Sequence, residues 1–155
     1  MKTIIFYLLL IVLPKLTFGQ NYINLNEYTI CSSPLDSIIK CVQQDVNDKE
    51  IIGVSARKDS DNVFTVFISA YSPKFLNYSN KLLGYTKRNN IIIFYLSSKE
   101  LVCKKSNNNN RIKLRCNPPP SKERPISVKG TDGAKEWTYR ISGDTITLKR
   151  KVLAW

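Results

Sequence analysis

One segment of the chain, residues 34–47, carries apolar residues at intervals of three and four positions. The apolar positions are Leu35, Ile38, Ile39, Val42 and Val46. This spacing predicts an amphipathic helix with one buried stripe. Ser32, Ser33 and Pro34 come just before the stripe, and a capping hydroxyl followed by a proline suits a first helical turn. We therefore expect one helix that lies along a sheet.

After this helix the apolar period changes to two. β-Branched and aromatic residues dominate between turn-forming residues, which is typical of antiparallel strands. Four pairs of strands are predicted: 50–57 with 62–71, 82–88 with 91–97, 100–105 with 111–117, and 135–142 with 145–152. The segment Ile91 to Leu96 is apolar on both faces and predicts a central strand covered by the helix. The expected fold class is α+β, with one N-terminal helix packed on an antiparallel β-meander of about six to eight strands.

The last predicted hairpin turns at Gly143-Asp144, and a two-residue loop fixes which side chains face each other. Trp137 and Tyr139 then fall on the apolar face, so we expect both in the core. The register pairs Tyr139 with Leu148 and Ile141 with Ile146 on that face, and Glu136 with Lys151 and Arg140 with Thr147 on the other.

An unbroken apolar run from Ile4 to Leu13 follows the positive charge of Lys2 and precedes the small residues Thr17 and Gly19. This order is typical of a secretory signal that is cleaved after Gly19. The run of about ten residues is too short for a membrane-spanning helix, which needs roughly 20. We expect a signal over residues 1–19 and a single domain over 20–155 that is secreted to the extracellular space or the periplasm, with no membrane span.

Basic residues outnumber acidic residues by two to one. The chain has 24 Lys+Arg and 12 Asp+Glu, a formal net charge of +12. Loss of Lys2 and Lys15 with the signal leaves 22 cationic residues against 12 acidic ones, or +10. Such a charge favours contact with nucleic acid, phospholipid, an acidic glycan or an acidic protein. The alternative is that the charge only keeps the protein in solution.

Four cysteines, Cys31, Cys41, Cys103 and Cys116, fall in the expected domain. An even number of cysteines in an oxidising compartment favours two disulfide bonds. Their wide spacing does not match the close cysteine pairs of zinc sites. If the predicted hairpin over 100–117 has a symmetric tip, Cys103 lies opposite Cys116. By elimination Cys31 would pair with Cys41.

The chain contains no histidine, which excludes mechanisms that use imidazole as a base or a metal ligand. Cysteine nucleophiles are disfavoured because disulfide bonds account for all four thiols. The carboxylates left for acid–base chemistry also have a simpler interpretation as solvated turn and helix-end residues. No cofactor and no metal are expected. These carboxylates are Asp59 and Asp61 on one turn, and Asp45, Asp48 and Glu50 at the helix end.

Two predicted hairpins carry basic side chains that are candidate contacts for an anionic partner. A solvated outer face is the alternative interpretation of both. The candidates are Lys104, Lys113 and Arg115, on the face opposite the cysteines of the third hairpin, and Arg140, Lys149 and Lys151 on the last.

Residues 117–133 begin with three prolines and show no apolar period, which predicts a long polar loop, either functional or a plain crossover. Asn77, Tyr78 and Ser79 match the acceptor triplet for N-glycosylation at Asn77. Together these features favour a secreted or periplasmic, non-enzymatic binding or inhibitor domain. Its basic strands or its long loop would contact an acidic protein, a glycan or another anionic polymer. A small secreted hydrolase that uses carboxylates, or a structural surface or envelope component, are the alternatives.

Overall fold

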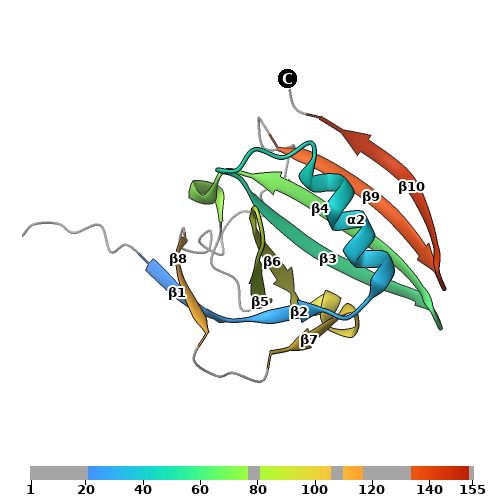
Figure 1. Ribbon diagram of the computed structural model, residues 1–155, viewed down its shortest axis with the longest axis horizontal. Coiled ribbons are helices and arrows are strands. Elements are labelled where there is room, and N and C mark those ends of the chain that lie inside the picture. The colour runs from blue at the N-terminus through green and yellow to red at the C-terminus, as the bar shows by residue number, and fades with distance from the viewer. Residues whose placement is uncertain (1–20, 77–80, 106–109, 117–133, 154–155) are drawn as a thin grey trace, which may run out of the picture.

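The computed structural model describes residues 21–76, 81–105, 110–116 and 134–153 (Figure 1). The predicted signal over 1–19, the glycosylation triplet at Asn77 and the predicted loop over 117–133 lie outside the described residues. Within these residues, no helix is both long and apolar enough to span a bilayer.

Most of the described residues lie in strands. The protein is therefore predominantly β, and the predicted α+β class is wrong: one helix of 11 residues accompanies ten strands in the described part of the chain. The elements are β1 (Asn21–Asn26), β2 (Tyr28–Ile30), α2 (Ser33–Gln43), β3 (Ile51–Ser60), β4 (Val63–Tyr71), the 3₁₀ helix η1 (Pro73–Phe75), β5 (Leu82–Lys87), β6 (Ile91–Tyr95), the 3₁₀ helix η2 (Leu96–Leu101), β7 (Val102–Lys104), β8 (Arg111–Cys116), β9 (Lys135–Ser142) and β10 (Thr145–Val152).

The main sheet has six strands in the order β10-β9-β4-β3-β6-β5. Three of its hairpins, β3–β4, β5–β6 and β9–β10, confirm the predicted pairs. The predicted meander of about six to eight strands is confirmed only in part, because β6 lies beside β3 and runs parallel to it, with Gly53 next to Ile93. The interior position of β6 explains why its sequence is apolar on both faces.

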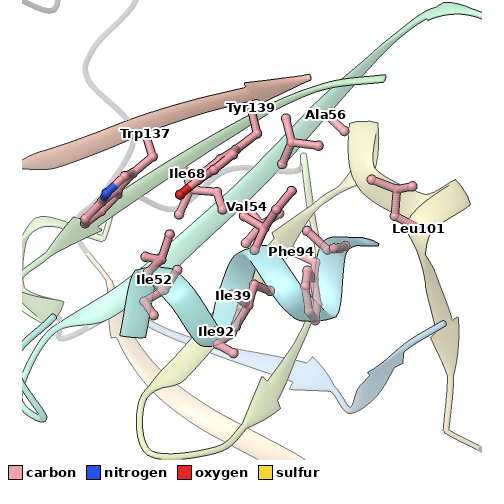
Figure 2. Packing of buried hydrophobic residues seen from close by; sticks show 14 of the residues in the cluster. Ile39, Ile52, Val54, Ala56, Ile68, Ile92, Phe94, Leu101, Trp137 and Tyr139 are labelled. Carbon is pink, nitrogen blue, oxygen red and sulfur yellow. The ribbon is translucent and has the colours of Figure 1, made fainter. Parts of the chain in front are cut away.

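Helix α2 lies across one face of this sheet (Figure 1). The Ser32 hydroxyl caps it by accepting a hydrogen bond from the Leu35 N–H at 3.3 Å, as the sequence predicts. The helix ends at Gln43, four residues before the predicted end, although Val46 is still buried. The predicted stripe is buried with Trp137 and Tyr139 of β9, and Figure 2 shows these two rings above Ile39 of the helix. Each fully buried aliphatic side chain contributes about 1.5–3 kcal/mol, so this layer is a major part of the stability.

The N-terminal segment forms a second layer that the sequence did not reveal. Strand β1 pairs with β8 and strand β2 pairs with β7, both antiparallel. The predicted hairpin over 100–105 and 111–117 is therefore wrong, because its two strands pair with the N-terminal segment instead of with each other. At the junction, the Glu27 N–H donates to the Asn110 carbonyl and the Lys105 N–H donates to the Glu27 carbonyl, each at 3.2 Å.

Within this second layer, β2 and β7 pack with the helix-side cluster through Tyr28, Ile30 and Val102, whereas the β1–β8 pair packs on the sheet face opposite α2. Its apolar residues meet the outward side chains of β3, β5 and β6 and form a second buried cluster. Gly84 lets the chain between β1 and β2 pass close to β5. A Cβ at Gly84 would lie 2.5 Å from the Asn26 carbonyl oxygen and 2.4 Å from the Tyr28 ring. The cluster contains Ile23, Leu25, Ile51, Leu76, Tyr85 and Ile93.

The disulfide bond joins Cys31 to Cys103, so the predicted pairings of Cys103 with Cys116 and of Cys31 with Cys41 are wrong. The cause is the strand pairing described above. Cys103 lies opposite Thr29 of β2, two residues before Cys31, and the Cα atoms of the bonded cysteines are 5.8 Å apart. Cys116 instead lies opposite Asn21 at the far end of β1. Cys41 is an exposed free thiol on α2.

The last hairpin confirms three of its four predicted pairs. Glu136 faces Val152 instead of Lys151, because a bulge between Leu148 and Arg150 shifts the register by one residue. As a result, Lys151 lies opposite Trp137, on the side of the sheet that faces the helix.

Candidate functional site

The outer surface of the β1–β8 pair gathers basic side chains. Along β8, Ile112 and Leu114 pack against the second buried cluster, so the side chains between them point to solvent. We call the solvent-side group the basic face; it consists of Arg111, Lys113 and Arg115 of β8 and Tyr22 of β1.

The three cations of the basic face are regularly spaced. Alternate residues on an antiparallel strand lie about 6.8 Å apart, which presents the charges as a row. Tyr22 lies opposite Arg115, and its ring is 47% exposed. The Lys113 ammonium lies 4.7 Å from the centroid of this ring, within the range of a cation–π interaction. The row therefore combines positive charge with an exposed aromatic surface.

Within the described residues, no carboxylate neutralises the charges of the basic face. Arg111, Lys113 and Arg115 are exposed, and none forms an ion pair with another described residue. Elsewhere in the described chain seven basic residues do have carboxylate partners within 4 Å: Lys40, Arg57, Lys58, Arg88, Lys105, Lys135 and Lys151.

The structure brings together only two of the six basic residues predicted from the sequence, Lys113 and Arg115. Lys104 lies on β7, opposite Tyr28, in a different strand pair. The predicted cluster on the last hairpin is divided between the two faces of the sheet. Arg140 lies on the side away from the helix, whereas Lys151 lies on the helix side and binds Asp45 at 2.8 Å. Lys149 occupies the bulge.

Sequence reasoning missed Arg111 and Tyr22. Arg111 continues the alternation of Lys113 and Arg115, so strand periodicity alone could have identified it. Tyr22 precedes the alternating residues Ile23 and Leu25, a short strand signal that was available in the sequence. Its pairing with β8 joins residues about 90 positions apart and has no local signal.

The predicted acidic candidates mostly serve as ion-pair partners. Asp59 accepts hydrogen bonds from Thr65 at 2.6 Å and Arg57 at 2.8 Å, and both contacts lower its pKa. Asp61 pairs with Lys58 at 3.4 Å, and Glu50 pairs with Lys135 at 2.9 Å. Their partners give these carboxylates structural roles. Residues 21–76, 81–105, 110–116 and 134–153 contain no group of three cysteine or acidic side chains arranged to hold a metal.

A separate pocket of about 230 Å³ lies on the sheet face opposite α2. Its lining residues belong to β3, β4, β6 and β9, and none of them lies in β1 or β8. Polar side chains and the half-exposed ring of Phe67 line it. It is distinct from the basic face, since the two share no residue.

Comparison with protein-family models, curated protein sequences and solved structures gives no match for this chain.

Proposed function

We propose that this protein is a secreted or periplasmic, non-enzymatic binding or inhibitor domain that holds an acidic partner on the basic face. The observation that carries the proposal is the row Arg111, Lys113 and Arg115, which is exposed, regularly spaced and without carboxylate partners in the described residues. A cluster of unneutralised cations raises the local concentration of anions and steers their approach.

The geometry favours an extended anionic polymer. A row of charges about 6.8 Å apart along one strand fits a chain whose own charges repeat along one direction better than it fits a compact anion. Arginine binds sulfate, phosphate or carboxylate groups through two parallel hydrogen bonds. The exposed Tyr22 ring adds a surface against which the partner can pack.

Two further features support a location outside the cytoplasm. The Cys31–Cys103 bond is of the kind that persists in oxidising compartments. The apolar run from Ile4 to Leu13 matches an export signal. Such a location makes acidic glycans and acidic surface proteins the accessible partners.

Binding to immobilised heparin and to polyglutamate over a series of salt concentrations tests the proposal. A variant with Arg111→Gln, Lys113→Gln and Arg115→Gln should bind at low salt roughly tenfold or more weakly. Its plot of log affinity against log salt should be shallower by about 2, because three fewer counterions are displaced.

A matched control removes the same charge elsewhere. Lys49, Lys87 and Lys99 are exposed and form no ion pair within the described residues. The variant with Lys49→Gln, Lys87→Gln and Lys99→Gln should retain nearly all of the affinity and the salt slope. Equal losses in the two triple variants would mean that net charge alone drives binding, and would overturn the assignment of the basic face.

A further inference from the structure

The pocket on the sheet face opposite α2 is built from two rows of side chains that cross three strands. Ser55 of β3, Phe67 of β4 and Thr138 of β9 form one row, because they are successive partners in the register. Gly53, Ser69 and Glu136 form the next row in the same way. All six residues line the pocket, and alternation along each strand points their side chains away from α2.

The middle of the first row is an aromatic ring that is open to solvent. Phe67 is 41% exposed and stands between two hydroxyl side chains. Tyr95 forms a wall of the pocket, and its hydroxyl lies 3.5 Å from the hydroxyl of Tyr71. Gly53 leaves room for the Tyr71 ring behind Tyr95, since a Cβ at Gly53 would lie 3.2 Å from that ring. The pocket therefore offers one flat apolar surface with polar groups around it.

Glu136 differs from most other carboxylates of this protein. It is half-buried near the start of β9, an interior strand, yet it forms no ion pair with any described residue. The hydroxyls of Ser55, Ser69 and Thr138 also have no hydrogen-bond partner in the part of the chain that the structure describes. As far as the described residues go, the pocket thus presents one carboxylate and three hydroxyls to a ligand.

The charges around the pocket limit the ligand class. Glu136 repels anions. Arg150 lies beside Thr138, and Arg140 lies one row further along the same face, so the surroundings disfavour an organic cation. A neutral ligand with several hydroxyl groups meets neither repulsion. A volume of about 230 Å³ is below the usual range for drug-sized ligands and suits a single ring.

We propose that this pocket binds one ring of a neutral carbohydrate. The apolar C–H face of the ring packs on Phe67, and Glu136 accepts hydrogen bonds from neighbouring ring hydroxyls. Ser55, Ser69 and Thr138 exchange the remaining hydrogen bonds. This site is independent of the basic face, and either proposal can fail without the other.

Chemical-shift mapping with ¹⁵N-labelled protein tests this inference. The probes are methyl glucoside, methyl galactoside, methyl mannoside and N-acetylglucosamine at millimolar concentrations, with choline as the cationic comparison. At least one sugar should give saturable shifts centred on the amides of Gly53, Ser69 and Thr138. Absence of saturable shifts with all four sugars, or saturable binding of choline at this site, would overturn the proposal.

Variants with matched controls separate the pocket from the rest of the surface. Phe67→Ala should weaken sugar binding about tenfold, and Glu136→Gln should weaken it severalfold. Phe75→Ala removes another ring that is 44% exposed, and Asp144→Asn removes another carboxylate without an ion pair in the described residues; both should leave binding unchanged. Thermal unfolding of each variant checks that the fold is retained. Equal affinity in Phe67→Ala and the unaltered protein would contradict the assignment.

Discussion

The Cys31–Cys103 bond should be a large single contribution to stability. It joins residues 72 positions apart. In the chain-entropy description, closing a loop of this length removes about 15 cal/mol/K of entropy from the unfolded chain, which corresponds to about 4 kcal/mol at room temperature. Cys103→Ser should lower the free energy of unfolding by about this amount. Cys41→Ser should change it by less than about 1 kcal/mol, because the Cys41 thiol is exposed and unbonded.

Urea unfolding without reductant, followed by circular dichroism, measures both variants. The comparison also distinguishes the observed bond from the pairing favoured by the sequence. A bond between Cys31 and Cys41 would close a loop of about ten residues, so Cys41→Ser would then cost about 3 kcal/mol. Equal destabilisation by Cys41→Ser and Cys103→Ser, or a Cys31–Cys41 cross-link in peptide mapping, would refute the strand pairing of the N-terminal segment.

Three further predictions concern packing and ionisation. Gly84→Ala should lower the free energy of unfolding by about 2 kcal/mol, because the new Cβ meets the Asn26 carbonyl oxygen. The control is Gly143→Ala, where a Cβ has open space but the backbone has a positive φ of 56°, and this variant should lose about 1 kcal/mol. Denaturant titration of both variants distinguishes the steric clash from the backbone strain. Lys40 and then Arg88 hold the pKa of Asp36 below its ordinary value. Their contribution to stability is therefore present above about pH 4 and is lost as the pH falls through the pKa of Asp36 in the folded protein. The free energies of unfolding of the unaltered protein and of Asp36→Asn should accordingly converge in acid, and a difference that stays constant would contradict this. Burial raises the pKa of Tyr139 to about 12, so stability should fall as the pH rises from about 10 toward 12. This loss should be smaller in Tyr139→Phe but not absent, because burial also raises the pKa of Tyr71 and of Tyr85.

Local patterns predicted the elements that local interactions determine. The helix cap at Ser32, the buried stripe that includes Leu35 and Ile38, and the three hairpins of the main sheet all follow from spacing and turn residues. The bulge before Arg150 lacks a glycine or other local marker, which is why Glu136 was paired with the wrong residue.

Long-range pairing limited the prediction of the fold. The sequence predicts a hairpin over 100–105 and 111–117, because its two halves alternate around a polar tip. In the structure, residues 21–30 separate those halves by pairing with both of them. The same error placed Cys103 opposite Cys116, and the unrecognised strands within residues 21–30 add to the β content that makes the α+β class wrong. Strand periodicity says that a strand exists but does not identify its partner.

The candidate site was predictable only in part for the same reason. Lys113 and Arg115 were identified because they alternate on one strand, whereas Tyr22 reaches them only through the β1–β8 pair. The pocket around Phe67 depends on the register of β3, β4 and β9 together. No single strand of the three indicates a binding site by itself.

Amide chemical shifts during a heparin titration test the central claim most directly, because they locate the anion on the surface. We expect the largest shifts in Asn21–Asn26 and Arg111–Cys116, with smaller changes on the last hairpin. Shifts centred on Arg140, Lys149 and Arg150, or spread evenly over all exposed lysines and arginines, would contradict the assignment of anion binding to the basic face.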